Sequence, residues 1–412
     1  MKRIDFIQQT LGLAGTLAIA GPLRAAPPTN PDALPVWPLP DLKTAFPEAI
    51  PIRSVELLRT QGELLLVVSA ENETRGVTQC NDRMAHLVSL LKGLVLPHFV
   101  GKDARDLPTL VDNAYRLNSN YKYAGMPLWN CIGTVEIATW DLLGQLAQKP
   151  VYQLLGKTVR TDYGVYISDF DRGTDPAEVV VDRLAQKLAQ TGATGVKIKV
   201  GGRMRNTPED DRRTRAFVPL VRKKLGDRVT IYADGNGSYS VKDGIETGKF
   251  LEDYNVAIFE EPCNFEDEEG LRTVNQALKK LVLAGGEQDT SLYRFQRLAR
   301  TGVYDLLQPD VYYNGGILRT LQVAEIARQS GKTLAPHSPK ADPLLGPFWQ
   351  VAAVCPNLFG LQEFVYNLNE KPAGWYLPAL TIANGKMRIP DRPGLGLQYD
   401  EHIWKTAERV IF

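Results

Sequence analysis

This chain has few cysteines and almost no net charge. Each of these features argues against a class of protein. The 412 residues include four cysteines without CxxC or zinc-type spacing, so we expect neither a disulfide framework nor a zinc site. With 48 Lys and Arg against 47 Asp and Glu, the formal net charge is +1, which argues against nucleic acid or an anionic membrane as partner. The 44% hydrophobic content supports a large core, and the length predicts two or three domains.

Long apolar runs are also missing, and the short one near the N-terminus is too short to span a membrane. Lys2 and Arg3 precede an apolar stretch over residues 11–21, which ends near the small residues Ala25 and Ala26. This order predicts a secretory signal peptide over residues 1–26 and an exported, periplasmic protein that is free of the membrane after processing. The sequence around Arg3 resembles a degenerate twin-arginine motif, so the export route stays open. The alternative is a buried amphipathic helix.

Three zones follow the N-terminal stretch. Residues 27–51 hold eight prolines, which predicts an extended leader. The next zone has a mixed α+β pattern, with strands expected over 52–57 and 64–69 and helices over 84–96 and 132–146. From residue 163 to 363 strands and helices alternate, and after residue 363 we expect the tail to return to the first domain. Eight strands are expected at 163–168, 194–200, 229–234, 257–261, 282–287, 304–309, 333–337 and 358–363, with helices such as 176–190 and 317–329 between them.

Seven polar residues stand at or near the ends of successive strands in the alternating zone. They lie 23 to 35 residues apart, about the length of one strand-plus-helix unit of an α/β barrel. In such a barrel the C-terminal ends of the strands meet at one mouth, where the chemistry takes place. The seven residues are Lys199, Asp234, Glu260, Glu287, Asp310, His337 and Glu363.

Two lysines, Lys197 and Lys199, stand two apart in the segment GVKIKV. A strand's period of two puts both ammonium groups on one face. If that face is the centre of a closed barrel, the two charges lower each other's pKa, and Lys199 becomes a candidate base near neutral pH. On an exposed edge strand the same pair is simply solvated.

The three acids Asp234, Glu260 and Glu287 end three consecutive strands. Carboxylates brought so close repel each other unless a hard cation neutralises them, so the pattern predicts one Mg²⁺, with Mn²⁺ as the alternative ion. Each acid could instead cap the following helix. Glu260 is preferred over Glu261 because Glu261 would face the opposite side. Asn236 shares the face of Asp234 and could contact a substrate hydroxyl.

Asp310 and His337 end adjacent strands of the series. A carboxylate beside an imidazole fixes its tautomer and raises its basicity. The other three histidines, His86, His98 and His402, are interpreted as structural. Glu363 closes the series as a hydrogen-bonding acid, provided that it stays protonated.

The ordered series KxK, DxN, EEP, GE, PD, PH and QE resembles the enolase superfamily, and specifically its mandelate racemase subgroup. The match covers roughly residues 50–412, and the segment IATWDLLGQLAQKPVYQLLG resembles the family's linker into its barrel. The resemblance implies an α/β fold, a modified TIM barrel of the (β/α)7β type with an α+β capping domain. The leader and capping domain would occupy 27–160, the barrel 161–363 and the returning tail 364–412.

The resemblance also implies a role for each residue. Asp234, Glu260 and Glu287 would bind Mg²⁺. Lys199 and His337 would be the two bases, with Asp310 orienting His337 and Lys197 tuning Lys199, and the substrate would be held by Asn236, Lys197 and Glu363.

The implied reaction is abstraction of the proton α to a carboxylate, through an enediolate. Dehydration of an acid sugar, an aldonate or aldarate, is the leading hypothesis. The alternatives are a racemase or epimerase, a cycloisomerase, and a non-catalytic protein that binds sugar acids. We expect a homo-oligomer that acts on a small carboxylate. One departure concerns the substrate: the segment 64–79 lacks the family's glycine-rich hairpin, where capping loops contact substrate.

Overall fold

The computed structural model describes residues 33–368 and 374–411. The predicted signal peptide, residues 1–26, lies outside this part of the chain. Within the described residues, no helix combines the length and the apolar character that crossing a bilayer requires.

A four-stranded antiparallel sheet forms the centre of the capping domain, in the order β16-β1-β2-β3. The strands are β1 (Ile52–Thr60), β2 (Glu63–Ala70), β3 (Arg75–Gln79) and β16 (Glu408–Ile411). Gln61 and Gly62 join β1 to β2 with positive φ angles of 52° and 84°, as a two-residue hairpin turn requires.

The long helix α5 (Met126–Ala147) packs on this sheet. It is buried continuously from Leu128 to Gly144, so it is a core helix rather than an amphipathic one. Gly76 of β3 allows the close approach, because an added Cβ there would lie 2.1 Å from the Ala138 carbonyl oxygen.

The capping domain differs from the sequence expectation in one helix. The expected helix over 84–96 is a succession of short turns: a 3₁₀ turn (Asp82–His86), α3 (Val88–Leu90), a π turn (Leu91–Val95) and a second 3₁₀ turn (Leu96–His98). Gly93 is a poor helix former, and Pro97 has no N–H to donate to the Gly93 carbonyl, so a regular helix cannot continue through this segment. The other expected helix, over 132–146, corresponds to α5. It is longer than predicted, because α5 starts six residues earlier, at Met126.

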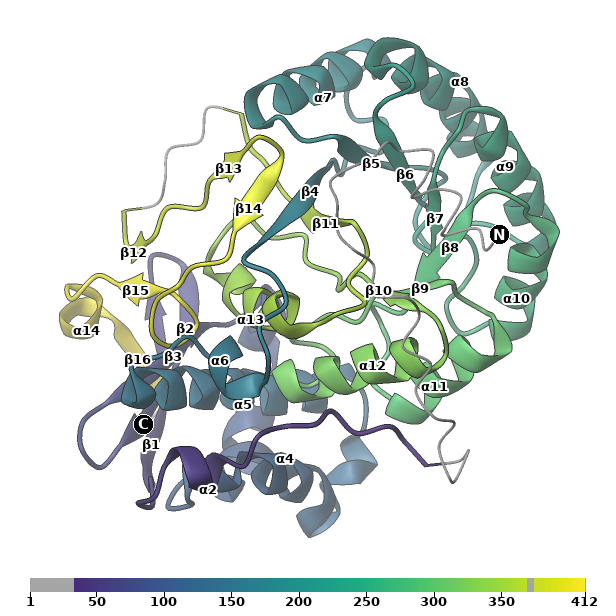
Figure 1. The fold of residues 1–412 in the computed structure, drawn as a ribbon. Helices are drawn as coiled ribbons and strands as arrows, with labels where there is room; N and C mark the ends of the chain where they lie inside the picture. Colours follow the sequence, from purple (N-terminus) through teal and green to yellow (C-terminus); the bar gives the residue numbers. More distant parts are fainter. Residues whose placement is uncertain (1–32, 369–373, 412) are drawn as a thin grey trace.

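Eight parallel strands and seven connecting helices form the barrel in the described part of the chain, which confirms the predicted (β/α)7β fold (Figure 1). The strands pair in sequence order from β4 to β10, and β11 pairs with β4. A bridge between Leu334 and Leu358 links β10 to the segment before β11. The strands are β4 (Asp162–Ser168), β5 (Gly195–Lys199), β6 (Thr230–Asp234), β7 (Ile258–Glu260), β8 (Val282–Gly285), β9 (Leu306–Leu307), β10 (Thr333–Leu334) and β11 (Leu361–Phe364).

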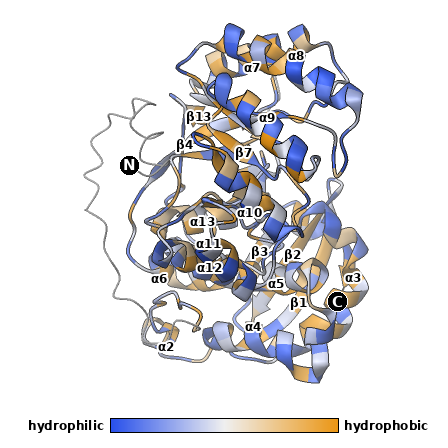
Figure 2. Cartoon of the chain, turned by 90° about the vertical axis from the view of Figure 1, so that its right-hand side faces the viewer, coloured by the Kyte–Doolittle hydropathy of each residue, from blue (hydrophilic) through white to orange (hydrophobic). Residues whose placement is uncertain are grey.

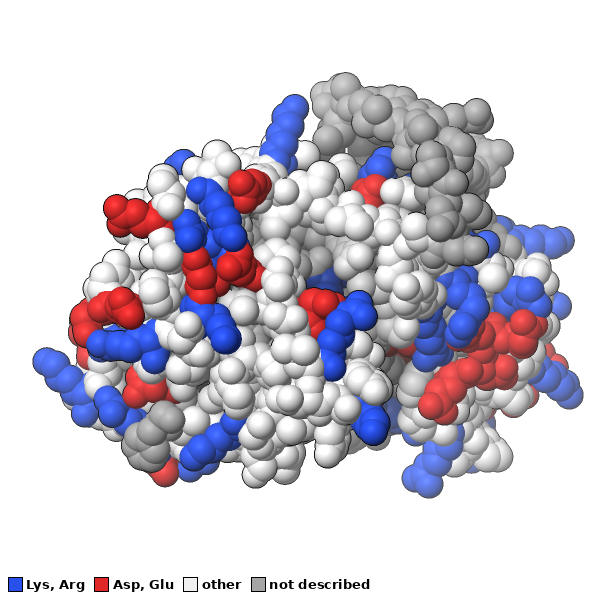
Figure 3. Space-filling model, turned by 90° about the horizontal axis from the view of Figure 1, so that it is seen from below, with Lys and Arg blue, Asp and Glu red and all other residues white. Residues whose placement is uncertain are grey.

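The helices form the outer ring of the barrel. They are α7 (Ala177–Thr191), α8 (Pro208–Leu225), α9 (Val241–Asp253), α10 (Glu268–Ala277), α11 (Leu292–Thr301), α12 (Ile317–Gln329) and α13 (Gly346–Val354). Figure 2 shows that the outer helices α7, α8 and α9 alternate apolar and polar residues, as expected for helices with one face on a sheet and one in water. On the face seen in Figure 3, basic and acidic side chains are interspersed.

The tail contacts both domains, whereas the sequence analysis expected only a return to the capping domain. β16 pairs with β1 of the cap. Before it, β14 (Lys386–Arg388) pairs antiparallel with β4 of the barrel and with β13 (Ile382–Ala383). A separate ribbon joins β12 (Tyr376–Leu377) to β15 (Gln398–Tyr399), and α14 (Ile403–Thr406) precedes β16.

The described part of the proline-rich leader, from residue 33, crosses the outside of the barrel in extended form before the short helix α2 (Leu42–Ala45). Gln296 of α11 donates to the Ala33 carbonyl at 3.0 Å, and Gln322 of α12 donates to the Pro35 carbonyl at 3.1 Å. The Trp37 indole donates to the Leu155 carbonyl of α6 (Tyr152–Leu155) at 3.0 Å. The leader therefore connects the barrel's outer helices to the segment between the two domains.

Candidate active site

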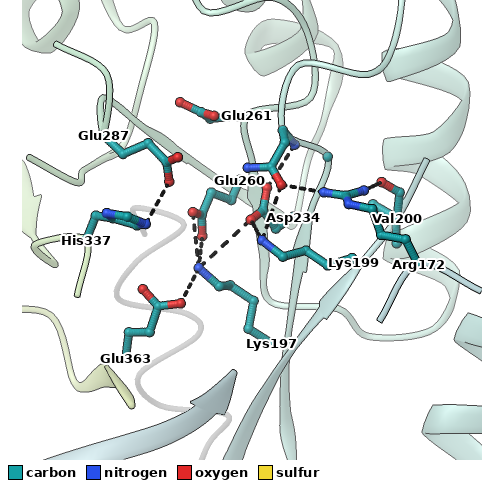
Figure 4. Close-up of polar contacts among 12 residues, drawn as sticks. Arg172, Lys197, Lys199, Val200, Asp234, Glu260, Glu261, Glu287, His337 and Glu363 are labelled. Atoms are coloured by element: carbon teal, nitrogen blue, oxygen red, sulfur yellow. Dashed lines mark hydrogen bonds and ion pairs between the residues drawn. The ribbon is translucent and has the colours of Figure 1, made fainter. Parts of the chain in front are cut away.

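Strand register brings the predicted site residues together at the mouth of the barrel. Lys199, Asp234 and Glu260 are direct neighbours on the parallel strands β5, β6 and β7. Glu287 follows the end of β8, and an isolated bridge pairs Asp310 with His337 beyond the short strands β9 and β10. Glu363 lies on β11. Figure 4 shows six of these side chains, all except Asp310, directed toward one another.

Lys197 lies at the centre of the carboxylates. Its Nζ is 2.6 Å from Glu363 Oε1, 3.2 Å from Glu260 Oε2 and 3.9 Å from Asp234 Oδ2. Lys199 pairs with Asp234 and donates to Asn236 Oδ1 at 3.2 Å. Both lysines share one face, as the period of two predicted, and both are buried.

The expected direction of the pKa shift is wrong for Lys197. Burial lowers its pKa, but the carboxylates of Glu260 and Glu363 outweigh burial and raise the pKa well above the usual range. Repulsion between the two lysines alone predicts a lowered pKa, and the surrounding acids reverse that direction. Lys197 is therefore a fixed cation rather than a base.

Glu363 does not meet the condition stated for it, that it stay protonated. Burial favours the neutral acid, but Lys197 and His337 lower the pKa of Glu363 to about 2. Glu363 is therefore a carboxylate, and it accepts a hydrogen bond from the Ser338 amide at 3.2 Å.

The three candidate metal ligands lie close enough to repel one another. Burial and then the charges of Asp234 and Glu287 raise the pKa of Glu260 to about 7, against the lowering effect of Lys197. Asp234 and Glu260 are turned toward the ammonium groups, and among the described residues no three His, Cys, Asp or Glu side chains converge as metal ligands do. The donor set itself is all carboxylate oxygen, which fits a hard divalent cation such as Mg²⁺.

His337 lies between two carboxylates. Its Nδ1 is 2.9 Å from Asp310 Oδ2, and its Nε2 is 3.3 Å from Glu287 Oε2. Burial lowers the imidazole pKa, but Glu287 and Asp310 outweigh burial and raise it. Asp310 also accepts from the amides of Tyr312 and Tyr313, so its carboxylate is held in place.

Two residues at the mouth carry positive φ angles although neither is glycine. Asn236 has φ 42° and Glu261 has φ 41°. Such angles are unfavourable for residues with a Cβ and concentrate at functional sites. Glu261 is buried and accepts from Gln288 Nε2 at 3.4 Å, whereas Glu260 accepts from Lys197.

The loop after β4 supplies two residues that the sequence analysis missed. Arg172 donates to the Val200 and Gly201 carbonyls at 3.2 Å each and also to Asn236 (Figure 4). The ring of Phe170 lies 5.4 Å from Lys199 Nζ. Both residues could have been predicted from their position directly after the first barrel strand, because the loops that follow the strands form the mouth of the barrel.

A cavity of about 560 Å³ opens above these groups, within the usual size range of ligand sites. Its lining includes Lys197, Lys199, Asn236, Glu287, His337 and Glu363. The capping domain and the loops around the mouth complete the wall, and the sequence analysis had assigned none of their residues. These are Glu63, Gln79, Asp82, Arg83, Thr174, Arg203, Gln288, Tyr313, Pro339, Lys340, Asp342 and Leu344.

Two family models match the two domains. The model of the mandelate racemase / muconate lactonizing enzyme N-terminal domain matches residues 52–156, and the model described as enolase C-terminal domain-like matches residues 180–403.

Characterised relatives share about a quarter to a third of their residues with this chain. The D-galactonate dehydratase of Variovorax paradoxus is 30% identical over 318 residues, which cover 75% of this chain and 81% of that protein. The arabinonate dehydratase of Saccharolobus solfataricus is 27% identical over 316 residues, covering 76% and 82%. Among solved structures, a mandelate racemase/muconate lactonizing protein of Paracoccus denitrificans complexed with magnesium is 26% identical, with a TM-score of 0.79 over 88% of this chain and 99% of that one.

Proposed function

Because this chain belongs to the mandelate racemase and muconate lactonizing enzyme family of the enolase superfamily, we propose that it removes the proton α to the carboxylate of an acid sugar. The chain is an acid-sugar dehydratase or an isomerase of the same superfamily. Dehydration of an aldonate or aldarate is the reaction we propose.

One observation carries the proposal: two groups able to exchange protons flank one cluster of carboxylates. Lys199 contacts Asp234 on one side, and His337 contacts Glu287 on the other, with Glu260 and Lys197 between them (Figure 4). A substrate held over this cluster would present opposite faces of its α-carbon to the two groups. Lys199 would take the α-proton, and His337, held by Asp310, would protonate the departing hydroxyl.

Asp234, Glu260 and Glu287 would hold one Mg²⁺, with Mn²⁺ as the alternative ion. When bound, the cation supplies positive charge that stabilises an enediolate oxygen. Lys197 remains an ammonium group between Glu260 and Glu363, where it attracts the substrate carboxylate, and Asn236 contacts a substrate hydroxyl.

A racemase or epimerase is the second candidate, because two proton-exchanging groups on opposite sides can also invert the α-carbon. A cycloisomerase would use the same enediolate. A protein that only binds sugar acids would not require the buried lysine pair, whose burial is costly without a catalytic use.

The test is a screen of acid sugars by NMR in deuterated water, with the magnesium-loaded enzyme and with the chelated enzyme. We expect deuterium incorporation at the α-carbon or loss of a hydroxyl, abolished by chelation and restored by Mg²⁺. Inversion without loss of water would identify a racemase or epimerase. Full activity of a rigorously metal-free preparation would contradict the metal assignment, and absence of both exchange and turnover across the panel would contradict the reaction.

A further inference from the structure

The loop that follows β4 is tied together by its own acidic side chains. Asp169 Oδ1 accepts from the Asp171 amide at 3.1 Å, and Asp171 Oδ2 accepts from the Asp175 amide at 3.1 Å. Arg183 of α7 pairs with Asp169 at 3.2 Å and with Asp175 at 2.6 Å, which attaches the loop to the helix that follows it. Aspartates that bond to the backbone two or more residues ahead are typical of well-defined turns. The loop therefore holds Arg172 at the barrel mouth from a fixed backbone.

The Arg172 guanidinium joins the loops that follow three neighbouring strands, β4, β5 and β6. Its Nη1 donates to the carbonyls of Val200 and Gly201 at 3.2 Å each, and also to the Gly202 carbonyl, all in the loop after β5. Its Nη2 donates to the side chain of Asn236, in the loop after β6. Both terminal nitrogens of the guanidinium are therefore engaged by the protein itself.

The amide of Asn236 lies between Arg172 and Lys199. Its Oδ1 accepts from Arg172 Nη2 and, at 3.2 Å, from Lys199 Nζ. Guanidinium and ammonium groups have no acceptor, so the Asn236 atom that faces both of them is the oxygen and not the nitrogen. The Asn236 backbone is fixed as well, because its amide donates to Asp234 Oδ1 at 2.8 Å and its carbonyl accepts from the Met204 amide at 2.9 Å.

We propose that Arg172 is a positioning residue for proton abstraction, and that it acts by fixing the orientation of the Asn236 amide beside Lys199. This inference rests on the proposed function, in which Lys199 takes the α-proton, and adds a role for Arg172. To act as the base, Lys199 must be a neutral amine, which keeps N–H donors and gains a lone pair. Donation of one N–H to Asn236 Oδ1 restricts rotation of the amine and leaves its lone pair free for the substrate.

Arg172 is needed because a neutral Lys199 cannot fix the Asn236 amide by itself. A neutral amine either donates to the amide oxygen or accepts from the amide nitrogen, so it tolerates both orientations of the Asn236 side chain. In the second orientation the amide N–H binds the lone pair, which is then unable to take a proton. The guanidinium of Arg172 only donates, so it stabilises the first orientation. Removal of Arg172 should therefore reduce the fraction of enzyme whose base is available.

Direct binding of a substrate carboxylate is the competing role for Arg172, because Arg172 also lines the cavity. Its engagement by three carbonyls and by Asn236 Oδ1 argues against this role. The two roles predict different kinetics. Loss of a positioning contact lowers kcat with little change in KM, whereas loss of a substrate contact raises KM.

The first experiment compares Arg172→Met with the wild type, both with Mg²⁺, on the aldonate or aldarate whose α-proton the wild type exchanges fastest in deuterated water. We expect kcat and the rate of deuterium incorporation to fall together by at least about tenfold, with KM changed less than about threefold, because small displacements of a catalytic group are costly. An unchanged kcat, with or without a raised KM, would overturn the inference and leave the proposed reaction intact. Absence of exchange and turnover in the wild type with every acid would instead refute the proposed function, and the inference with it.

The second experiment tests whether Arg172 acts through Asn236. Arg172→Met is introduced into the wild type and into Asn236→Ala, and exchange is followed over long incubations so that slow variants are measurable. In the Asn236→Ala background we expect Arg172→Met to lower the exchange rate less than about twofold, because the amide that Arg172 orients is gone. The same fold loss in both backgrounds would overturn the inference. If Arg172→Met does not fold, Arg172→Lys replaces it in the same comparison, since one ammonium group cannot bind the loop carbonyls and Asn236 together.

Arg213→Met is the matched control. Arg213 of α8 donates to the Gly201 carbonyl at 2.5 Å and to the Lys199 carbonyl at 3.4 Å, so it binds the same loop as Arg172. None of its hydrogen bonds to the described residues reaches the Asn236 side chain. We therefore expect Arg213→Met to keep kcat and the exchange rate close to the wild-type values. A loss as large as that of Arg172→Met would show that the loop after β5 carries the effect instead of Asn236, and would overturn the inference.

Discussion

Separate substitutions of Lys199 and His337 should distinguish the proton-abstraction step from the elimination step. The two side chains have different partners: Lys199 contacts Asp234 and Asn236, whereas His337 contacts Asp310 and Glu287. Neither substitution therefore removes a direct partner of the other group. We expect Lys199→Met to lose both α-proton exchange and turnover. His337→Asn should lose elimination and retain exchange.

The expected loss of turnover in Lys199→Met follows from the proposed role of Lys199 as the general base. A positioned general base contributes about 10²–10⁴ in rate, which corresponds to about 3 to 5 kcal/mol of activation free energy. The fold should survive, because Asp234 keeps Lys197 at 3.9 Å as a positive neighbour after Lys199 is removed. Lys199→Met should also still bind Mg²⁺, since Lys199 is not a proposed ligand.

The assay is NMR in deuterated water, which follows deuterium incorporation and formation of the dehydrated product together. Exchange that persists in Lys199→Met and disappears in His337→Asn would reverse the two roles. Near-normal turnover in both variants would refute the reasoning, because the chemistry would then occur without either group.

Two further predictions concern stability and export. Asp141 is 4% exposed and accepts from the Val77 and Leu395 amides at 2.7 and 2.6 Å, and burial raises its pKa from 3.8 to about 7. The folded protein therefore holds this proton more tightly than the unfolded chain, so the contribution of Asp141 to the free energy of unfolding should fall by up to ~4 kcal/mol as pH rises from about 4 to 7. Denaturant titrations should find this dependence missing in Asp141→Asn; parallel pH profiles for the two proteins would contradict it. For export, we propose a periplasmic protein whose mature N-terminus lies near Pro27, and sequencing of protein from the native host would contradict this if it found an intact Met1.

The residues at the strand ends could be predicted because simple geometry determines them. Lys197 and Lys199 share a face through the period of a strand, and parallel register then places Asp234 beside Lys199 and Glu260 beside Asp234. Their protonation states could not be predicted in the same way. The direction of the Lys197 shift depends on its distances to Glu260 and Glu363, and sequence spacing does not give those distances.

The residues that line the cavity from the capping domain could not be predicted, because their position depends on how the two domains pack. The buried carboxylate of Glu136 on α5 accepts from the amides of Ile317 and Leu318 at 2.9 Å each, at the start of the barrel helix α12. This contact fixes the cap on the barrel and so contributes to placing Gln79 over the mouth. No local sequence pattern predicts such a contact, since its partners lie more than 180 positions apart in the sequence.

The two lysines of the KxK pair are chemically different although they share one strand face. Lys197 is surrounded by Glu260, Glu363 and, farther away, Asp234, so loss of its proton would leave three buried acids without their central cation. Among the described residues, Lys199 forms an ion pair with Asp234 and donates a hydrogen bond to Asn236 Oδ1. The arrangement therefore gives Lys197 a permanent positive charge, and Lys199 is the lysine that we propose as the base.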